Sequence, residues 1–231
     1  ARSMQEGQPV AGVHVTFHSG PTRIVERPAN VIGLLRGSDP DLAKEAIVFS
    51  AHMDHVGTRE LDGRQEVWNG ADDNASGTAA LLEIAGAFVE AGAPARSIII
   101  LFVSGEEKGL WGSSWYVDHP LWPLGDTVCN INTDMVGRNA SDDLMITPSP
   151  RHGSFNTVAQ AGFAMGASEG FVIRHKGIKP NPGSDAYFGR SDHANFARKG
   201  IPVCFFFADI HEDYHGPHDT WDKLDLDKMR R

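Results

Sequence analysis

Continuous apolar runs that end in charged or histidine-bearing turns are the feature that most restricts the fold of this chain. Residues 98–103 (IIILFV) carry no polar side chain, and the segment SGEE follows directly. A strand that is apolar on both faces is typical of a parallel sheet covered by helices on each side. Two adjacent carboxylates at such a strand end repel one another and raise each other's pKa. We therefore interpret Glu106 and Glu107 as a pair in which one residue binds a metal ion and the other moves a proton.

Further apolar runs alternate with segments of helical periodicity. Strands are predicted at residues 30–35, 45–51, 128–132, 144–147 and 203–207, with a leading strand at 10–17 that forms an edge hairpin with the first of them. Helices are predicted at residues 76–90, 110–119, 152–165 and 191–199. This alternation predicts an α/β fold, with a mixed, largely parallel central sheet between helices. Since no linker or repeat interrupts the 231 residues, we expect a single domain over residues 1–231.

Composition disfavours several classes of function. The formal net charge is −9 and the 21 Lys and Arg residues are scattered, which argues against nucleic acid as a partner because phosphate backbones bind clustered basic side chains. The apolar runs are far shorter than the roughly 20 residues that span a bilayer, so we expect a soluble chain with no membrane span. No signal pattern follows Ala1, and one interpretation is an exported full-length form, secreted or periplasmic, whose signal has been removed. No pattern specifies an oligomeric state.

The two cysteines are expected to be buried thiols. Cys129 and Cys204 each lie inside an apolar strand-like run, where a free thiol most often packs as a small hydrophobe. A disulfide between them is the less favoured alternative, so the redox compartment stays open.

Polar segments that follow five apolar runs mark the candidate site. In open α/β sheets ligands bind beyond the carboxyl ends of the strands. The segments are AHMDH at 51–55, GADDNASG at 70–77, SGEE at 104–107, NTDMVGR at 132–138 and DYHGPHDTW at 213–221. Each has an ordinary interpretation as a capped turn or a solvated loop, but packing gives no reason for all five to occur together.

The residue types in these segments indicate a metal site. Imidazole nitrogen and carboxylate oxygen ligands suit Zn²⁺, with Co²⁺ or Mn²⁺ as feasible substitutes. Residues two apart in an extended segment share a face. The Asp54 carboxylate is therefore predicted to hold the second ring nitrogen of His52 and to fix its tautomer for metal binding.

These segments, together with GRSDHANFARKGIPV at 189–203, resemble the co-catalytic dizinc aminopeptidases of metallopeptidase family twenty-eight. The resemblance covers residues 30–226 with its motifs in order, and it implies the three-layer zinc exopeptidase (phosphorylase/hydrolase-like) fold. It implies an aminopeptidase that binds two Zn²⁺ per chain and acts on peptides with a free N-terminus. The ligands that it implies are His52, Asp73, Glu107, Asp134 and His215.

The resemblance also divides these ligands between two ions. Asp73 would bridge both ions, with His52 and Asp134 completing one site and Glu107 and His215 completing the other. The three carboxylates leave about one positive charge on two Zn²⁺, which favours an anionic nucleophile formed from a shared water.

Neighbouring residues compete for these positions. The family's motif spacing selects Asp73 over Asp72, which is expected to be a structural turn residue, and His215 over His218. The peptide bond between Asp73 and Asn74 is implied to be cis. Three further histidines are weaker candidates for contact with substrate: His55, His193 and His211.

The remaining roles concern catalysis and the substrate pocket. Glu106, whose neighbour would be committed to zinc, is expected to take a proton from the water and deliver it to the leaving amine. Tyr214 matches the position from which some relatives donate a hydrogen bond to the oxyanion. Arg190, Ser191 and Asp192 lie where the family builds part of its substrate pocket, although Ser191 or Asp192 as a helix cap is an equal alternative. Residues 205–207 either line an apolar side-chain pocket or form a buried strand.

Three other functions remain open on the sequence. A carboxypeptidase or dipeptidase would use the same two ions. A glutaminyl-cyclase-like transferase shares the fold but uses one zinc, and a non-catalytic binding domain would be expected to have lost ligands. A complete ligand set for two ions weighs against the last two.

Overall fold

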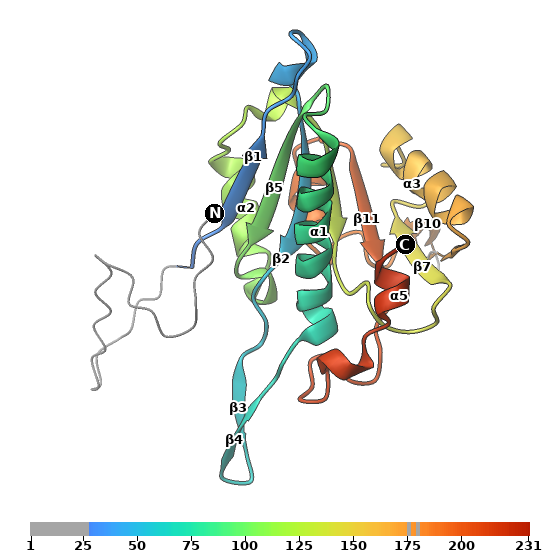
Figure 1. Ribbon diagram of the computed structural model, residues 1–231. Coiled ribbons are helices and arrows are strands. Elements are labelled where there is room, and N and C mark those ends of the chain that lie inside the picture. Colours follow the sequence, from blue (N-terminus) through green and yellow to red (C-terminus); the bar gives the residue numbers. More distant parts are fainter. Residues whose placement is uncertain (1–27, 175–176, 179–180) are drawn as a thin grey trace, which may run out of the picture.

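A seven-stranded sheet forms the centre of the computed structural model, which describes residues 28–174, 177–178 and 181–231 (Figure 1). Its strand order is β1-β5-β2-β6-β11-β7-β8. The strands are β1 (Val31–Leu35), β2 (Ala46–His52), β5 (Ser97–Val103), β6 (Thr127–Thr133), β7 (Asp143–Thr147), β8 (Val172–Arg174) and β11 (Val203–Phe207). The four central strands β5, β2, β6 and β11 pair in parallel, whereas β1 and β7 run antiparallel to their central neighbours. The predicted mixed, largely parallel sheet is confirmed.

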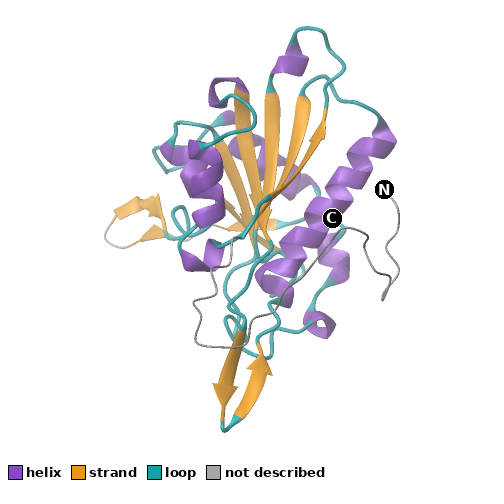
Figure 2. Cartoon of the chain, turned by 90° about the vertical axis from the view of Figure 1, so that its left-hand side faces the viewer, coloured by secondary structure: helices purple, strands orange, loops and turns teal. Residues whose placement is uncertain are grey.

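Helices cover both faces of this sheet (Figure 2). On one face, α1 (Gly77–Ala91) packs against β2, β5 and β6, and α3 (Thr157–Ser168) packs against β7, β8 and β11. On the other face, α2 (Trp111–Asp118) contacts α4 (His193–Arg198), which lies against β6 and β11. A short helix, α5 (Leu226–Met229), lies near the C-terminus.

The continuous apolar run in β5 reflects burial on both faces. Ile99 and Leu101 join the core cluster that includes α2 and α4, whereas Ile98 and Ile100 join the cluster that includes Leu81 of α1. Because alternate residues of a strand point to opposite faces, a strand between two helical layers needs apolar side chains at every position.

The strand order reverses beside β2. The chain passes from β2 through α1 to β5 on one side, and then through α2 to β6 on the other side. At such a switch point the connections diverge and leave a crevice beyond the carboxyl ends of the strands. Three of the five polar segments predicted from the sequence directly follow β2, β5 and β6.

Several boundaries differ from the sequence-based prediction. Helix α3 begins at Thr157, later than expected, because the Asn156 side chain accepts hydrogen bonds from the backbone N–H groups of Val158 (2.9 Å) and Ala159 (3.0 Å) and so forms the N-cap. The strand predicted at residues 10–17 lies outside the described residues. Both Cys129 and Cys204 are free and buried, as expected.

Some elements were not predicted at all. The hairpin of β3 (Thr58–Leu61) and β4 (Arg64–Val67) turns at Asp62 and Gly63, both with positive φ. Asp-Gly is a strong hairpin signal, but the flanking residues lack apolar alternation. A second pair, β9 (Gly177–Ile178) and β10 (Asn181–Asp185), was also not predicted, and neither were β8, α5 and five short turns: Leu42–Lys44, Ala71–Ser76, Glu106–Lys108, Leu124–Asp126 and Trp221–Lys223. Within the described residues, no helix combines the length and hydropathy that crossing a bilayer requires.

Helix α1 offers a matched test of the packing. Leu81 is fully buried against the sheet, and its neighbour Leu82 is 58% exposed. We expect Leu81→Ala to lower the free energy of unfolding by about 2–5 kcal/mol because it leaves a cavity. The control Leu82→Ala should change it by no more than about 0.5 kcal/mol. Urea denaturation of both variants measures the difference, and equal losses would show that α1 does not pack as described.

Candidate metal centre

Five separate segments bring side chains to the crevice beyond the sheet. His52 ends β2, and Asp134 directly follows β6. Glu107 lies in the turn that follows β5, and Asp73 lies in the kinked turn Ala71–Ser76 before α1. His215 lies in the loop after β11. The five residues that the resemblance implies as ligands therefore come together in the folded chain.

Asp73 stands between two groups of these side chains. Its Oδ1 lies 3.2 Å from His52 Nε2, which in turn is 3.4 Å from Asp134 Oδ1. Its Oδ2 lies 3.1 Å from His215 Nε2, which is 3.0 Å from Glu107 Oε2. Each oxygen of one carboxylate thus faces a different histidine. This is the arrangement that a bridging ligand requires.

The donor set fits metal ions. Within the described part of the chain, the buried side-chain atoms that have no hydrogen-bond partner include four atoms of the implied ligands: His52 Nε2, Asp134 Oδ1, Glu107 Oε1 and His215 Nε2. Unpaired buried polar atoms are costly. A Zn²⁺ ion bonds nitrogen and carboxylate oxygen at about 2.0–2.2 Å, so it can sit between atoms that are 3.0–3.4 Å apart.

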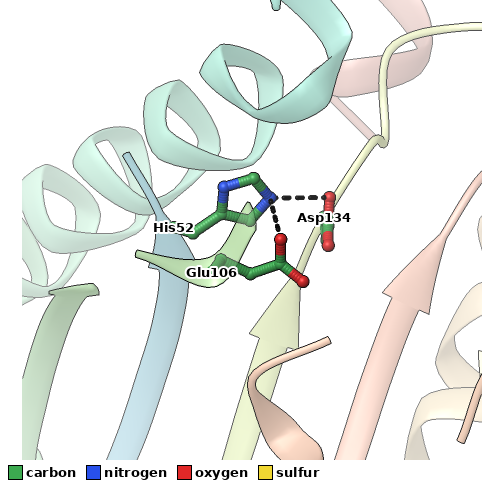
Figure 3. A group of neighbouring side chains, drawn as sticks. All are labelled: His52, Glu106 and Asp134. Carbon is green, nitrogen blue, oxygen red and sulfur yellow. Dashed lines mark ion pairs between the residues drawn. The ribbon is translucent and has the colours of Figure 1, made fainter. Parts of the chain in front are cut away.

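Glu106 lies beside the first group, which is formed by Asp73, His52 and Asp134. Figure 3 shows its carboxylate and that of Asp134 directed toward the His52 ring, with Glu106 Oε2 4.0 Å from His52 Nε2. This distance is longer than the 3.0–3.4 Å that separate the atoms of the implied ligands. Burial raises the pKa of Glu106 to about 9, and the negative charges of Asp134, Asp192 and Glu107 add to that effect although His52 opposes it. A carboxyl group in a cleft with a pKa this far above its usual value is a candidate for proton transfer.

Asp54 holds His52 by a different group from the one predicted. The backbone carbonyl oxygen of Asp54 lies 3.0 Å from His52 Nδ1, whereas its carboxylate is 3.8 Å from that nitrogen. The carboxylate instead accepts the backbone N–H groups of Glu106 (3.1 Å) and Glu107 (3.3 Å). Because a carbonyl only accepts, Nδ1 carries a proton, and in the neutral imidazole Nε2 is therefore the nitrogen with the free lone pair. The predicted tautomer stands, and the carboxylate fixes the glutamate turn.

The turn that carries Asp73 is held from two sides. Its Asp73–Asn74 peptide bond is cis, as the resemblance implies. The Asn74 side chain donates to the Thr133 carbonyl at 3.1 Å and accepts from the N–H of Met135 at 3.2 Å, which ties the turn to the end of β6. Asp72 accepts the N–H of Gly137 at 2.6 Å, in line with its expected structural role.

Asp219 is a functional residue that the sequence interpretation missed. Its buried carboxylate accepts the backbone N–H groups of Asp72 at 3.0 Å and of Asp73 at 3.1 Å. The segment that carries His215 is thereby bound to the turn that carries Asp73. In the family's motif, the pair Asp219-Thr220 serves to identify His215 as the ligand. The fixed spacing of the Asp219 carboxylate from that ligand also indicated a role for Asp219 itself.

A buried chain of hydrogen bonds ends on Asp134. Asn130 donates to Ser50 Oγ (2.9 Å), and Ser50 donates to Asn132 Oδ1 (2.6 Å). Asn132 donates to Ser191 Oγ (2.9 Å), which donates to Asp134 Oδ2 (2.7 Å). Oδ2 is thus occupied, and Oδ1 is left for the centre. The signal in the sequence was the presence of polar side chains inside otherwise apolar strands.

The predicted pocket residues separate into two groups. Arg190 and Tyr214 line the hollow beside Glu106 and Asp134, and the Tyr214 ring stacks on that of His215 at 3.9 Å between centroids. Asp192 does not line that hollow.

Asp192 and Ser191 face the interior instead. Asp192 is fully buried and accepts the hydroxyl of Ser113 at 2.5 Å. Neither residue caps α4 through its side chain: Asp192, at the N-cap position, makes no such bond, and Ser191 donates to Asp134. Phe205 and Phe207 face the hollow, and Phe206 packs with the cluster under α3.

The three weaker histidine candidates also differ. His193 is buried against the rings of Phe188 and Phe205, and burial lowers its pKa to about 3. His211 lies 3.4 Å from the carboxylate of Asp72. His55 alone of the three reaches the centre, with Nδ1 3.0 Å from Glu107 Oε1.

Comparison with known proteins gives one consistent family. The profile of Peptidase family M28 matches residues 30–231. Aminopeptidase YwaD of Bacillus subtilis is 27% identical over 212 residues, covering 87% of this chain and 42% of that protein. A probable leucine aminopeptidase of Trichophyton verrucosum is 26% identical over 205 residues, covering 84% of this chain and 53% of that protein.

A solved structure supports the same relationship. The crystal structure of BSAP, a zinc aminopeptidase from Bacillus subtilis, has a TM-score of 0.67 and 26% identity, covering 87% of this chain and 46% of that one. The chain spans about half the length of the curated relatives it matches.

Metal binding should release protons. Burial opposes protonation of His52, but Asp134 and Asp73 outweigh it and raise its pKa well above the usual value. The carboxylates of Asp73 and Glu107, 3.1 and 3.0 Å from His215 Nε2, raise the pKa of His215 to about 9. Below about pH 9 the His215 imidazole holds a proton that a metal must displace, and the raised pKa of His52 favours a proton there as well. Affinity for Zn²⁺ should therefore weaken as pH falls from about 9 to 6. Calorimetric titration at pH 7 in two buffers of different ionisation enthalpy should give different heats, and identical heats would contradict the account.

Proposed function

The chain belongs to peptidase family M28, and from this we propose that it carries the catalytic centre of a zinc-dependent aminopeptidase that removes N-terminal residues from peptides. The observation that carries the proposal is the position of Asp73, whose two oxygens each contact the histidine of a different ligand group. His52 and Asp134 would complete one ion site, and Glu107 and His215 the other.

Zinc is the metal favoured by the donor set and by similarity to known zinc enzymes. BSAP is described as a zinc aminopeptidase, and a relative in Leptosphaeria maculans is a probable zinc metalloprotease. Two histidine nitrogens and three carboxylates are ligands that Co²⁺ or Mn²⁺ also accept. We therefore expect two Zn²⁺ per chain, with these ions as substitutes.

Glu106 is the proposed general base. When bound, two Zn²⁺ would acidify a shared water, polarise the substrate carbonyl and favour the ionised form of nearby carboxyl groups. Glu106 accepts the proton of that water and donates it to the leaving amine. Its position 4.0 Å from His52 Nε2 leaves its oxygen atoms free for this transfer. The Tyr214 hydroxyl, on the same hollow, donates to the developing oxyanion.

The walls of the hollow suit a free N-terminal residue. Glu106 and Asp134 present carboxylates that can receive a protonated α-amine. Met135, Phe205 and Phe207 form an apolar wall against which the first side chain of the substrate would lie. Arg190 lies at the same hollow, where its guanidinium is 5.7 Å from the centre of the Tyr187 ring.

A substrate pair tests the exopeptidase assignment. The zinc-loaded protein should hydrolyse a leucine anilide with a free amine, and acetylation of that amine should lower kcat/KM by about 100-fold or more, because the charged contact at the carboxylates is lost. A peptide with a free carboxyl end and a blocked amine serves as the comparison. Preferential cleavage of that blocked peptide would indicate a carboxypeptidase instead.

A single substitution tests the base. Glu106→Gln keeps the size of the side chain but cannot accept a proton, so kcat/KM on aminoacyl anilides should fall by about 10²–10⁴-fold while bound zinc is unchanged. Glu83→Gln, at an exposed position on α1, makes the same chemical change away from the centre and should leave both quantities unaltered. Near-normal turnover by Glu106→Gln would exclude Glu106 as the base.

A further inference from the structure

We propose that His55 is a further protein ligand of the metal ion held by Glu107 and His215. The inference rests on the proposed two-ion centre and goes beyond the five ligands that the family resemblance implies. It would make this ion site richer in protein ligands than its neighbour at His52.

His55 lies beside the second ligand group, which is formed by Asp73, Glu107 and His215. Its Nδ1 is 3.0 Å from Glu107 Oε1 and 3.8 Å from Asp73 Oδ2. The ligating atoms of His55, Asp73 and Glu107 all lie within 4.8 Å of one another. Glu107 Oε2 meanwhile faces His215 at 3.0 Å. Glu107 therefore has one histidine at each oxygen.

The nitrogen atoms of His55 are unpaired. Both are buried, and neither has a hydrogen-bond partner among the residues that the structure describes. Glu107 Oε1 is unpaired as well, so the 3.0 Å contact between it and Nδ1 lacks hydrogen-bond geometry. A buried imidazole without partners is costly. A metal ion would satisfy the lone pair that the protein leaves unused.

The backbone makes room for this ring. Gly70 has a φ of +64°, and a Cβ at this position would lie 2.5 Å from His55 Cγ. The ring therefore packs directly on the glycine backbone, where a side chain would displace it. On its other side it meets the His215 ring edge-on, with centroids 5.6 Å apart. These contacts hold His55 over the second ligand group.

The alternative role for His55 is that of a hydrogen-bond donor that orients Glu107. Donation from Nδ1 to a ligating carboxylate is a common way to position it. The two roles predict different effects of Asn at this position, because the Asn amide can donate from nearly the same place as Nδ1–H but lacks an imidazole lone pair.

Zinc titration of the metal-free protein separates the roles. Wild-type protein and the exposed control His218→Ala should each bind two ions in a chelator-competition titration. Both His55→Ala and His55→Asn should weaken one of the two steps by at least about tenfold and leave the other unchanged. In the Co²⁺-loaded protein, the visible absorption of one ion should intensify in both variants, because its coordination number falls.

Three results would overturn the inference. Wild-type affinity in His55→Ala would show that His55 makes no contribution to metal binding. Wild-type affinity and absorption in His55→Asn, with a loss in His55→Ala, would assign His55 as a hydrogen-bond donor. Fewer than two ions bound by wild-type protein would remove the two-ion centre itself, and this outcome is distinct from a failure of the His55 ligand alone.

Discussion

Repulsion among carboxylates gathered beyond the carboxyl ends of the parallel strands is the constraint on which the rest of the structure depends. Asp73, Glu106, Glu107 and Asp134 converge in a largely buried crevice, where negative charges without compensation are costly. Burial is the largest cause of the raised pKa of Glu106, about 9, and the charges of the neighbouring carboxylates add to it. Two histidines offset part of the charge and the proposed metal ions would offset the rest, while hydrogen bonds from neighbouring segments hold Asp134 and the turns that carry Asp73 and the glutamate pair.

The positioning groups come from segments that are distant in the sequence. Asp219 holds the turn of Asp73, the Asp54 carboxylate holds the turn of the glutamate pair, and the chain through Asn132 and Ser191 holds Asp134. Each bond uses the face of a carboxylate that does not point into the centre, or a backbone N–H beside it. The ligand geometry is thus set by the fold, which reduces the reorganisation needed when a metal or a substrate binds.

The sequence was sufficient to predict the sheet and the segments that converge, because strand-end position is a local property, and the resemblance to the family identified the individual ligand residues. It was not sufficient for contacts decided by distant segments. Asp54 was expected to hold His52 by its carboxylate, but the backbone of the glutamate turn occupies that group. Asp192 was expected at the pocket rim, but it turns inward to Ser113. The position of His55 depends on Gly70, which only the folded chain brings beneath its ring.

Anomalous diffraction from zinc-soaked crystals, measured on both sides of the zinc absorption edge, tests the central claim most directly. The account predicts two peaks about 3.5–4 Å apart, one on each side of the Asp73 carboxylate, with His52 and Asp134 at one peak and Glu107 and His215 at the other. A single peak, or two peaks that do not share Asp73, would contradict it.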